Sequence, residues 1–149
     1  PAGRLCRPMT AGWAAPAAIL ETALYAADLD AAEAFYGGLI GLRRVVRAGQ
    51  RHVFFRCGAG MLLIFNPTET RRPAEGPLPV PPHGAEGAGH VCFAAEAGEI
   101  DLWRERIAAA GLAVEADFLW PNGARSLYLR DPAGNSVEFA EPRLWSDQE

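Results

Sequence analysis

The feature that most constrains the fold is a pattern of one strand, one helix and three strands that occurs twice along the chain. In the first half the pattern predicts a strand over residues 19–25, a helix from Asp28 and strands over residues 43–48, 52–57 and 61–66. In the second half it predicts a strand over 90–95, a helix over 100–110 and strands over 113–118, 126–130 and 136–140. The halves also share their spacing of glycines and arginines, so internal duplication is the best structural inference.

Local signals support the two helices. Asp28 stands where an N-cap accepts hydrogen bonds from free backbone N–H groups. Apolar residues then recur at three- and four-residue steps through Leu39, as they do from Ile100 to Ala110 in the second half. Gly41 and Gly111 follow the two helices, and Gly111 is placed to adopt the left-handed conformation that ends a helix.

The two halves belong to a single domain of residues 19–142, because 149 residues leave room for one cooperative core. Module one spans 19–66 and module two spans 90–142. Residues 67–89 between them form a linker, since residues 67–82 hold six of the 12 prolines and several glycines follow. Residues 1–18 are predicted to be an N-terminal extension, and residues 143–149 a C-terminal tail.

Composition excludes several classes of protein. The 14 Lys and Arg against 18 Asp and Glu give a net charge of −4, without a basic patch for nucleic acid. No apolar run approaches the roughly 20 residues that a membrane helix needs, and the first residues lack the pattern of a secretory signal. Three cysteines without CxxC spacing, Cys6, Cys57 and Cys92, favour a reducing compartment. We therefore expect a cytoplasmic protein that binds neither membranes nor nucleic acid.

Three segments carry a resemblance to a known family: LYAADLDAAEAFY at residues 24–36, GHVCF at 89–93 and YLRDPAGNSVEF at 128–139. They resemble the vicinal oxygen chelate superfamily, which holds glyoxalases, bleomycin resistance proteins and extradiol dioxygenases. The most specific piece is the DPxGNxxE element that ends at Glu138. The resemblance implies an α+β fold in which two βαβββ modules form a curled mixed sheet around a central cup. It also implies a homodimer, whose interface the apolar lead through Trp13 is expected to help bury.

The resemblance further implies one divalent metal ion, which the family binds with the first and last strands of each module. Matched residue by residue, these positions are Glu21, His90 and Glu138. The last strand of module one offers only Leu62, Leu63 or Ile64, so the four-ligand glyoxalase cage is incomplete, which argues against a lactoylglutathione lyase. One imidazole and two carboxylates suit Zn, Mn, Fe, Ni or Mg, and the sequence does not choose among them.

Strand alternation gives this ligand set independent support. Glu138 lies between Val137 and Phe139, and a buried carboxylate without a partner is costly. The alternative for Glu138 is a buried salt bridge, with Arg130 or Arg56 as its partner. For His90 the alternative is a hydrogen-bonded core histidine, and for Glu21 it is a solvated surface side chain.

Substrate contacts are predicted on two strand faces and one loop. His52 and Arg56 share one face, Ser126, Tyr128 and Arg130 share another, and Trp120 lies in the WPNG loop. The alternatives are surface ion pairs for the arginines and packing for Tyr128 and Trp120. His83 in the linker is interpreted as an exposed histidine.

These observations predict a divalent-metal-dependent enzyme that acts on a small substrate with vicinal oxygens. Glu21 or Glu138 is its candidate general base. Lyase, isomerase and dioxygenase chemistry all remain open. The competing interpretation is a metal-free, bleomycin-resistance-like protein that only binds a small molecule.

Overall fold

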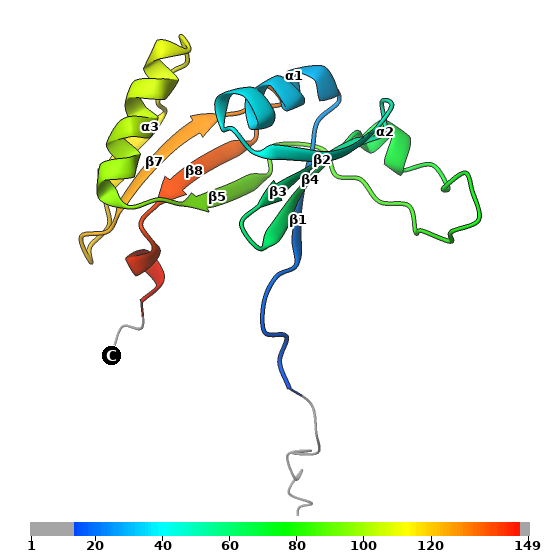
Figure 1. Cartoon of the computed structure of the whole chain (residues 1–149), viewed down its shortest axis with the longest axis horizontal. Coiled ribbons are helices and arrows are strands. Elements are labelled where there is room, and N and C mark those ends of the chain that lie inside the picture. Colours follow the sequence, from blue (N-terminus) through cyan, green and yellow to red (C-terminus); the bar gives the residue numbers. More distant parts are fainter. Residues whose placement is uncertain (1–13, 147–149) are drawn as a thin grey trace, which may run out of the picture.

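A computed structural model describes residues 14–146, and it contains the strand–helix–three-strand order twice (Figure 1). The first unit consists of β1 (Glu21–Tyr25), α1 (Leu29–Glu33), η1 (Ala34–Leu39), β2 (Arg43–Ala48), β3 (His52–Cys57) and β4 (Gly60–Phe65). The linker contains one short helix, α2 (Pro67–Thr70). The second unit consists of β5 (His90–Ala94), α3 (Ala97–Ala109), β6 (Ala116–Leu119), β7 (Arg125–Arg130), β8 (Ser136–Ala140) and η2 (Pro142–Trp145).

Each unit forms its own four-stranded mixed sheet, which confirms the predicted fold class. Sheet A has the strand order β1-β4-β3-β2 and sheet B the order β5-β8-β7-β6. In both sheets the first strand of the module runs parallel to the last, and the remaining pairs are antiparallel. The matching order in the two sheets agrees with the internal duplication expected from the sequence.

The local signals act largely as predicted, with small shifts at several boundaries. The Asp28 side chain caps α1 by accepting a hydrogen bond from the N–H of Ala31 at 3.0 Å. Helix α3 begins at Ala97 rather than at residue 100, because Glu96 and Glu99 form a reciprocal capping box. The first strand begins at Glu21 rather than at residue 19. The strand predicted over 113–118 covers Ala116–Leu119, where its backbone pairs with β7.

A single hydrophobic core joins the two modules. It combines fully buried side chains from both helices, such as Leu29 of α1 and Ile100 of α3, with the inner faces of both sheets. Helix α1 packs on β3 and β4, and α3 packs on β7. Each sheet therefore has one face covered by its own helix, and we call the opposite face its free face. No helix within residues 14–146 is long and apolar enough to cross a membrane.

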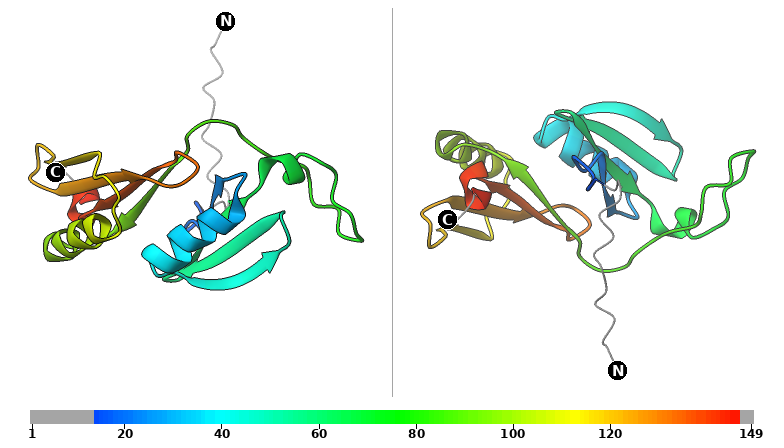
Figure 2. Two further views of the ribbon diagram at one scale, coloured as in Figure 1. Left: turned by 90° about the horizontal axis from the view of Figure 1, so that it is seen from above. Right: turned by 90° about the horizontal axis from the view of Figure 1, so that it is seen from below.

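The two free faces point in opposite directions. In the view from above, α3 lies below sheet B whereas α1 lies above sheet A (Figure 2, left). Side chains on the free face of one sheet are therefore turned away from those on the free face of the other within the same chain.

The DPAGN turn between β7 and β8 joins module two to module one through hydrogen bonds. The hydroxyl of Tyr36 donates to Asp131 Oδ2 at 2.8 Å, and the Asn135 side-chain amide donates to the carbonyl of Tyr25 at 3.1 Å. The Asn135 side-chain oxygen also accepts from the N–H of Gly89 at 2.7 Å. Because Asp131 and Asn135 are buried, these bonds satisfy polar groups that have little access to water.

Candidate functional site

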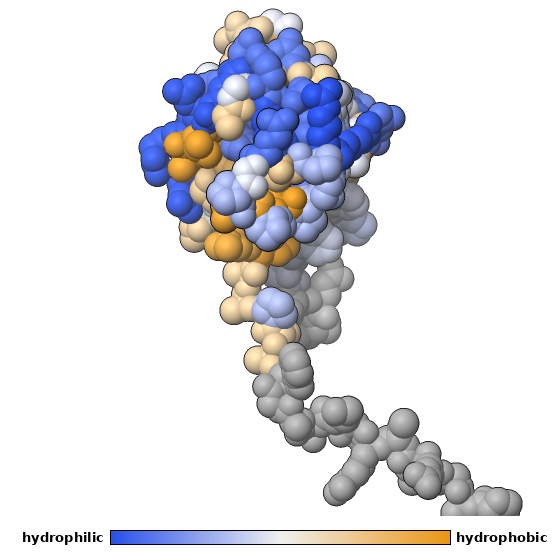
Figure 3. All heavy atoms as spheres, turned by 90° about the vertical axis from the view of Figure 1, so that its right-hand side faces the viewer, coloured by the Kyte–Doolittle hydropathy of each residue, from blue (hydrophilic) through white to orange (hydrophobic). Residues whose placement is uncertain are grey.

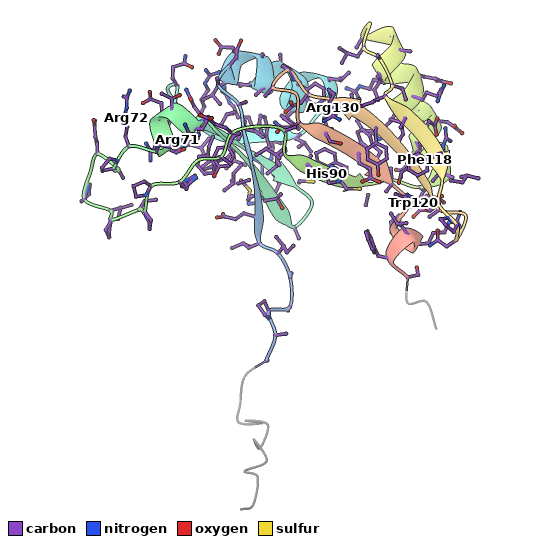
Figure 4. All side chains as sticks on the ribbon, turned by 180° about the vertical axis from the view of Figure 1, so that it is seen from behind. Arg71, Arg72, His90, Phe118, Trp120 and Arg130 are labelled. Atoms are coloured by element: carbon purple, nitrogen blue, oxygen red, sulfur yellow. The ribbon has the colours of Figure 1, made fainter. Side chains whose placement is uncertain are left out.

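The free face of sheet B gathers five of the predicted site residues: His90, Ser126, Tyr128, Arg130 and Glu138. The strand register places Glu138 on β8 between Cys92 of β5 and Tyr128 of β7, so all three side chains share one face. His90 lies one step along the same face of β5. Figure 4 shows His90 and Trp120 on this module, far from Arg71 and Arg72 on the linker.

Glu138 is a buried carboxylate with one unpartnered oxygen. Its side chain is only 7% exposed, and Oε1 is buried without a hydrogen bond. Oε2 lies 3.2 Å from Nε2 of His90. The salt bridge to Arg130 or Arg56 that served as the alternative is absent: Arg130 pairs with Glu115, and Arg56 reaches only the carbonyl of Ala59. A carboxylate in this position favours a proton or a cation beside it, because an unpaired buried charge is costly.

The orientation of His90 also favours a proton or a cation beside Glu138. Its Nδ1 lies 3.1 Å from the carbonyl oxygen of Ser136, which can only accept, so Nδ1 carries the proton. In the neutral ring, Nε2 then turns a lone pair toward the Glu138 carboxylate. Two acceptors at this distance are stable only when a proton or a metal ion lies beside both. A backbone carbonyl on the second ring nitrogen is also the usual support of a metal-binding histidine.

The spacing of these two atoms fits a pair of neighbouring metal ligands. Two bonds of about 2.1 Å that meet at about 90° to 110° separate the ligand atoms by about 3.0 to 3.4 Å. The 3.2 Å between Nε2 of His90 and Oε2 of Glu138 lies in this interval. The residues on sheet B therefore fit half of a divalent-metal site.

Two neighbouring groups remain protonated over the physiological range. Burial, followed by the nearby Glu138 charge, raises the pKa of the Cys92 thiol to about 12. Burial and the proximity of Glu138 likewise raise the pKa of the Tyr128 hydroxyl to about 12. Cys92 is therefore a poor thiolate ligand or nucleophile, whereas Tyr128 stays available as a neutral hydrogen-bond donor.

Aromatic side chains form one wall beside this centre. Tyr128 stacks between His90 and Phe118, with ring centroids 6.3 and 5.8 Å away, and Phe118 meets Trp120 at 5.0 Å. Ser126 is fully buried and orients Trp120 by accepting from its Nε1 at 2.8 Å. The adjoining cavity of about 520 Å³ is lined by His90, Trp120, Pro121, Asn122, Tyr128, Glu138, Leu144 and Trp145.

Sequence reasoning missed two residues of this cavity. Leu144 and Trp145 fall in the segment predicted to be a tail, but η2 turns them toward the cavity. The available signal was the apolar pair itself, which is unusual in a terminal segment of otherwise polar residues. Trp145 is 83% exposed, as is expected of a side chain that borders an open cavity.

The other predicted residues do not contact Glu138. Glu21 and His52 share the free face of sheet A and line a second cavity of about 570 Å³ together with part of the linker. Arg56 lies on that face but is exposed. Arg130 is held by both oxygens of Glu115, at 2.6 and 2.9 Å. These contacts favour the ion-pair alternative for Arg130 over substrate binding.

The three predicted metal ligands do not converge within one chain. Among residues 14–146, no group of three or more His, Cys, Asp or Glu side chains is arranged to hold a metal ion. The packing turns the free face that carries Glu21 away from the free face that carries His90 and Glu138 (Figure 2).

The register also identifies the missing fourth position. Arg56 pairs with Met61 as Arg130 pairs with Ser136, so Leu63 corresponds to Glu138 and Glu21 corresponds to His90. Of the three candidates considered, Leu63 is thus the counterpart on the free face. It is 6% exposed and offers no ligand atom.

Comparison with known proteins identifies the family. The model of the Glyoxalase/Bleomycin resistance protein/Dioxygenase superfamily matches residues 18–139. A crystal structure of lactoylglutathione lyase from Agrobacterium tumefaciens is 53% identical, with a TM-score of 0.84, and the match covers 89% of this chain and 98% of that one. No curated protein matches significantly.

More distant solved structures share the fold. A glyoxalase/bleomycin resistance protein/dioxygenase from Nocardioides is 23% identical, with a TM-score of 0.67 over 87% of this chain and 85% of that one. A glyoxalase family protein from Bacillus anthracis is 20% identical, with a TM-score of 0.65 over 87% and 98%. The family model over residues 18–139 and the 53% identical lyase show that the chain is an enzyme that belongs to the Glyoxalase/Bleomycin resistance protein/Dioxygenase superfamily.

Proposed function

We propose that this protein is a divalent-metal-dependent lyase that acts on a small substrate with two neighbouring oxygens. We further propose that it works as a homodimer, in which Glu21 of one subunit joins His90 and Glu138 of the partner subunit around the ion. The observation that carries the proposal is the buried Glu138 carboxylate, whose Oε1 has no partner and whose Oε2 lies 3.2 Å from Nε2 of His90.

The homodimer follows from the opposed free faces. A two-fold axis that brings sheet A of one chain to face sheet B of another also brings sheet B of the first to sheet A of the second. Each chain then contributes to two equivalent sites. Glu21, which is exposed in the isolated chain, and the half-exposed His90 would both become enclosed.

The protein side chains divide the work at such a site. A bound divalent ion would supply Lewis-acid polarisation of the substrate oxygens. Glu21 or Glu138 accepts a proton from the substrate carbon, because both carboxylates border the place where the oxygens bind. The neutral hydroxyl of Tyr128 donates a hydrogen bond to an oxygen that gains negative charge. Trp120 and Trp145 limit access of water from the open side of the cavity.

The first reaction to assay is formation of S-lactoylglutathione from methylglyoxal and glutathione. The 53% identical relative is named for that activity, although the missing fourth ligand argued against it. With Leu63 in that position, the proposed site has three protein ligands and leaves the other positions to water and substrate.

Metal analysis and mixing of variants test the proposal together. Purified wild-type protein should hold about one divalent ion per chain, and Glu138→Gln and Glu21→Gln should each lose the ion and the activity. When the two inactive variants are mixed, dissociated and allowed to reassociate, about half of the dimers contain one chain of each variant. In such a mixed dimer both substitutions fall in one of the two sites, and the other site has all three wild-type ligands. About a quarter of wild-type activity should return.

The outcomes separate the parts of the proposal. A site formed inside one chain would gain nothing from mixing, which would refute the shared site. Equal and negligible metal in wild type and Glu138→Gln would refute metal dependence and leave a protein that only binds a small molecule.

A further inference from the structure

The linker is held in place against sheet A. The N–H of His83 donates to the carbonyl of Thr70 at 3.0 Å, and the Tyr25 hydroxyl lies 2.8 Å from Nδ1 of His83. At Gly84 an added Cβ would lie 2.9 Å from Cγ of Arg71 and 3.2 Å from the carbonyl of Pro67, so this close approach needs a glycine. His83, interpreted from sequence as exposed, is half-buried and fixed.

The linker and the free face of sheet A enclose an aromatic pocket. Its floor is set by two rows of the sheet, in which Phe54 adjoins Leu63 and His52 adjoins Phe65. Phe65 lies edge-to-face with Phe54 and with His83, at centroid distances of 5.1 and 4.5 Å, and His52 stacks on Phe54 at 4.2 Å. Val80, Pro81 and Pro82 of the linker form the outer wall of this cavity of about 570 Å³.

The charges of the pocket lie at its ends. Glu21 lines one end, beside Met61, and Arg51 lines the other, next to the row of His52 and Phe65 about 13 Å further along the sheet. Arg51 is engaged with the carbonyl of Glu69 at 2.7 Å. Burial, with a smaller effect of Arg51, lowers the pKa of His52, so this ring is neutral at physiological pH. The space between the ends is therefore uncharged and bordered by ring faces and edges.

The surroundings of the pocket are polar. On the side of the molecule that carries the linker, apolar side chains gather in small patches among hydrophilic ones (Figure 3). A confined apolar space with edge-on and stacked rings suits a planar aromatic group, whose face and edge complement those of its neighbours.

We propose that the linker and the free face of sheet A form a binding subsite for an aromatic substituent of the substrate, between Phe54, Phe65 and His83. The substituent would extend along sheet A from the end marked by Glu21. The direction of the substrate rests on the proposed function, which puts the two oxygens near Glu21, but every wall named here belongs to one chain.

Two neutral diols test the subsite directly. 1-Phenyl-1,2-ethanediol and 1,2-propanediol both carry neighbouring oxygens and differ only in phenyl against methyl. Their dissociation constants can be measured by ¹H–¹⁵N NMR titration, with and without added Zn²⁺. The phenyl compound should bind about tenfold more tightly in both conditions, and the shifted amides should include those of the linker and β3.

Linker variants show whether the preference comes from this pocket. His83→Ala and Val80→Ala should reduce the preference for phenyl to about threefold or less. His83→Gln, which keeps a hydrogen-bonding group near Tyr25 without an aromatic ring, should behave like His83→Ala. Leu78→Ala is the matched control, since Leu78 lies on the same linker, is 69% exposed and does not line the cavity. Thermal unfolding of each variant verifies that it is folded.

The subsite and the proposed function fail in different ways. Equal affinity for the two diols in wild type, or a phenyl preference that survives both His83→Ala and Val80→Ala, would overturn the subsite. A phenyl preference that depends on His83 supports the subsite even if Zn²⁺ changes neither affinity. That last result would count against the metal-dependent function alone.

Discussion

The two modules share one architecture but use corresponding positions for different chemistry. In module two the free face carries Glu138, Tyr128 and His90; the register places Leu63, Phe54 and Glu21 at the matching positions of module one. The inner faces of both sheets remain apolar and contribute to one core. The duplicated apolar core therefore preserves the fold, whereas residues on the free faces can differ between the modules without disturbing it.

The largest expected effect comes from making module two resemble module one. Glu138→Leu should abolish metal binding and lower kcat/KM by about 1000-fold or more, because a ligand and a candidate base are lost together. The metal-free variant should unfold at the same temperature as wild type or higher, since a buried carboxylate without a partner is removed. Metal analysis, kinetics and thermal unfolding measure these effects.

A matched control for that change is Glu115→Leu. Glu115 belongs to the same module, but its side chain is 49% exposed and pairs with Arg130 at the surface. This variant should keep both metal and activity. Wild-type metal content in Glu138→Leu would contradict the role of Glu138 as a metal ligand of module two.

The reverse substitution places a glutamate at the position of module one that corresponds to Glu138. Leu63 is 6% exposed, so Leu63→Glu should destabilise the metal-free protein by about 3 kcal/mol or more through burial of a charge. Divalent metal should restore much of this loss, because the new carboxylate occupies the position that Glu138 has in module two. Denaturant unfolding with and without Zn²⁺ measures the restoration. An unchanged loss in saturating Zn²⁺ would show that position 63 lies away from the ion.

The turns that precede the last strands also differ between the modules. The β3–β4 turn needs only Gly58 and Ala59, whereas the β7–β8 turn carries the contacts between modules. Asn135→Ala should cost about 2 kcal/mol or more, since the N–H of Gly89 and the carbonyl of Tyr25 lose their partner. Ala59→Ser, in the exposed turn of module one, should change the free energy of unfolding by less than about 0.5 kcal/mol. Similar losses in both variants would contradict the fastening role of Asn135.

The smallest expected effect is on the pH dependence of stability, where Tyr128 can titrate and its counterpart Phe54 cannot. Burial and Glu138 raise the pKa of Tyr128 from 10 to about 12 in the folded protein. The unfolded chain then loses this proton first, so the contribution of Tyr128 to stability is complete below about pH 10 and declines as the pH rises to about 12. Tyr128→Phe should lose less stability than wild type over that interval. Parallel unfolding curves for the two proteins between pH 9 and pH 11.5 would contradict the raised pKa.

Local features of the fold were predictable because their causes are close in sequence. The Asp28 cap depends on an N–H three residues away, and the turn after α3 depends on Gly111, whose φ is 73°. Alternation along β8 places Glu138 opposite the apolar residues that flank it, without knowledge of the partner strands. Helix α3 begins three residues before the position that its apolar periodicity indicates, because the capping box of Glu96 and Glu99 starts the helix ahead of its first buried residue, Ile100.

The pairing of Glu138 with His90 was also anticipated, through the two motifs that contain them. The positions of Leu144, Trp145 and His83 were not, since each depends on how a segment without periodic pattern folds back onto a sheet. A proline-rich linker has no repeat from which its contacts can be inferred. Its course is set by particular contacts, such as that between the Tyr25 hydroxyl and His83.

By itself the sequence determined the two modules, the order of helices and strands along the chain and the face on which each candidate side chain lies, because helix caps, glycine turns and strand alternation act over a few residues. Only the tertiary structure decided how the modules are oriented. That orientation results from the shared core and from the contacts of Tyr36, Asp131 and Asn135, which link residues about a hundred positions apart. These long-range contacts turn Glu21 away from His90 and Glu138, and so divide the candidate site between opposite faces of the chain.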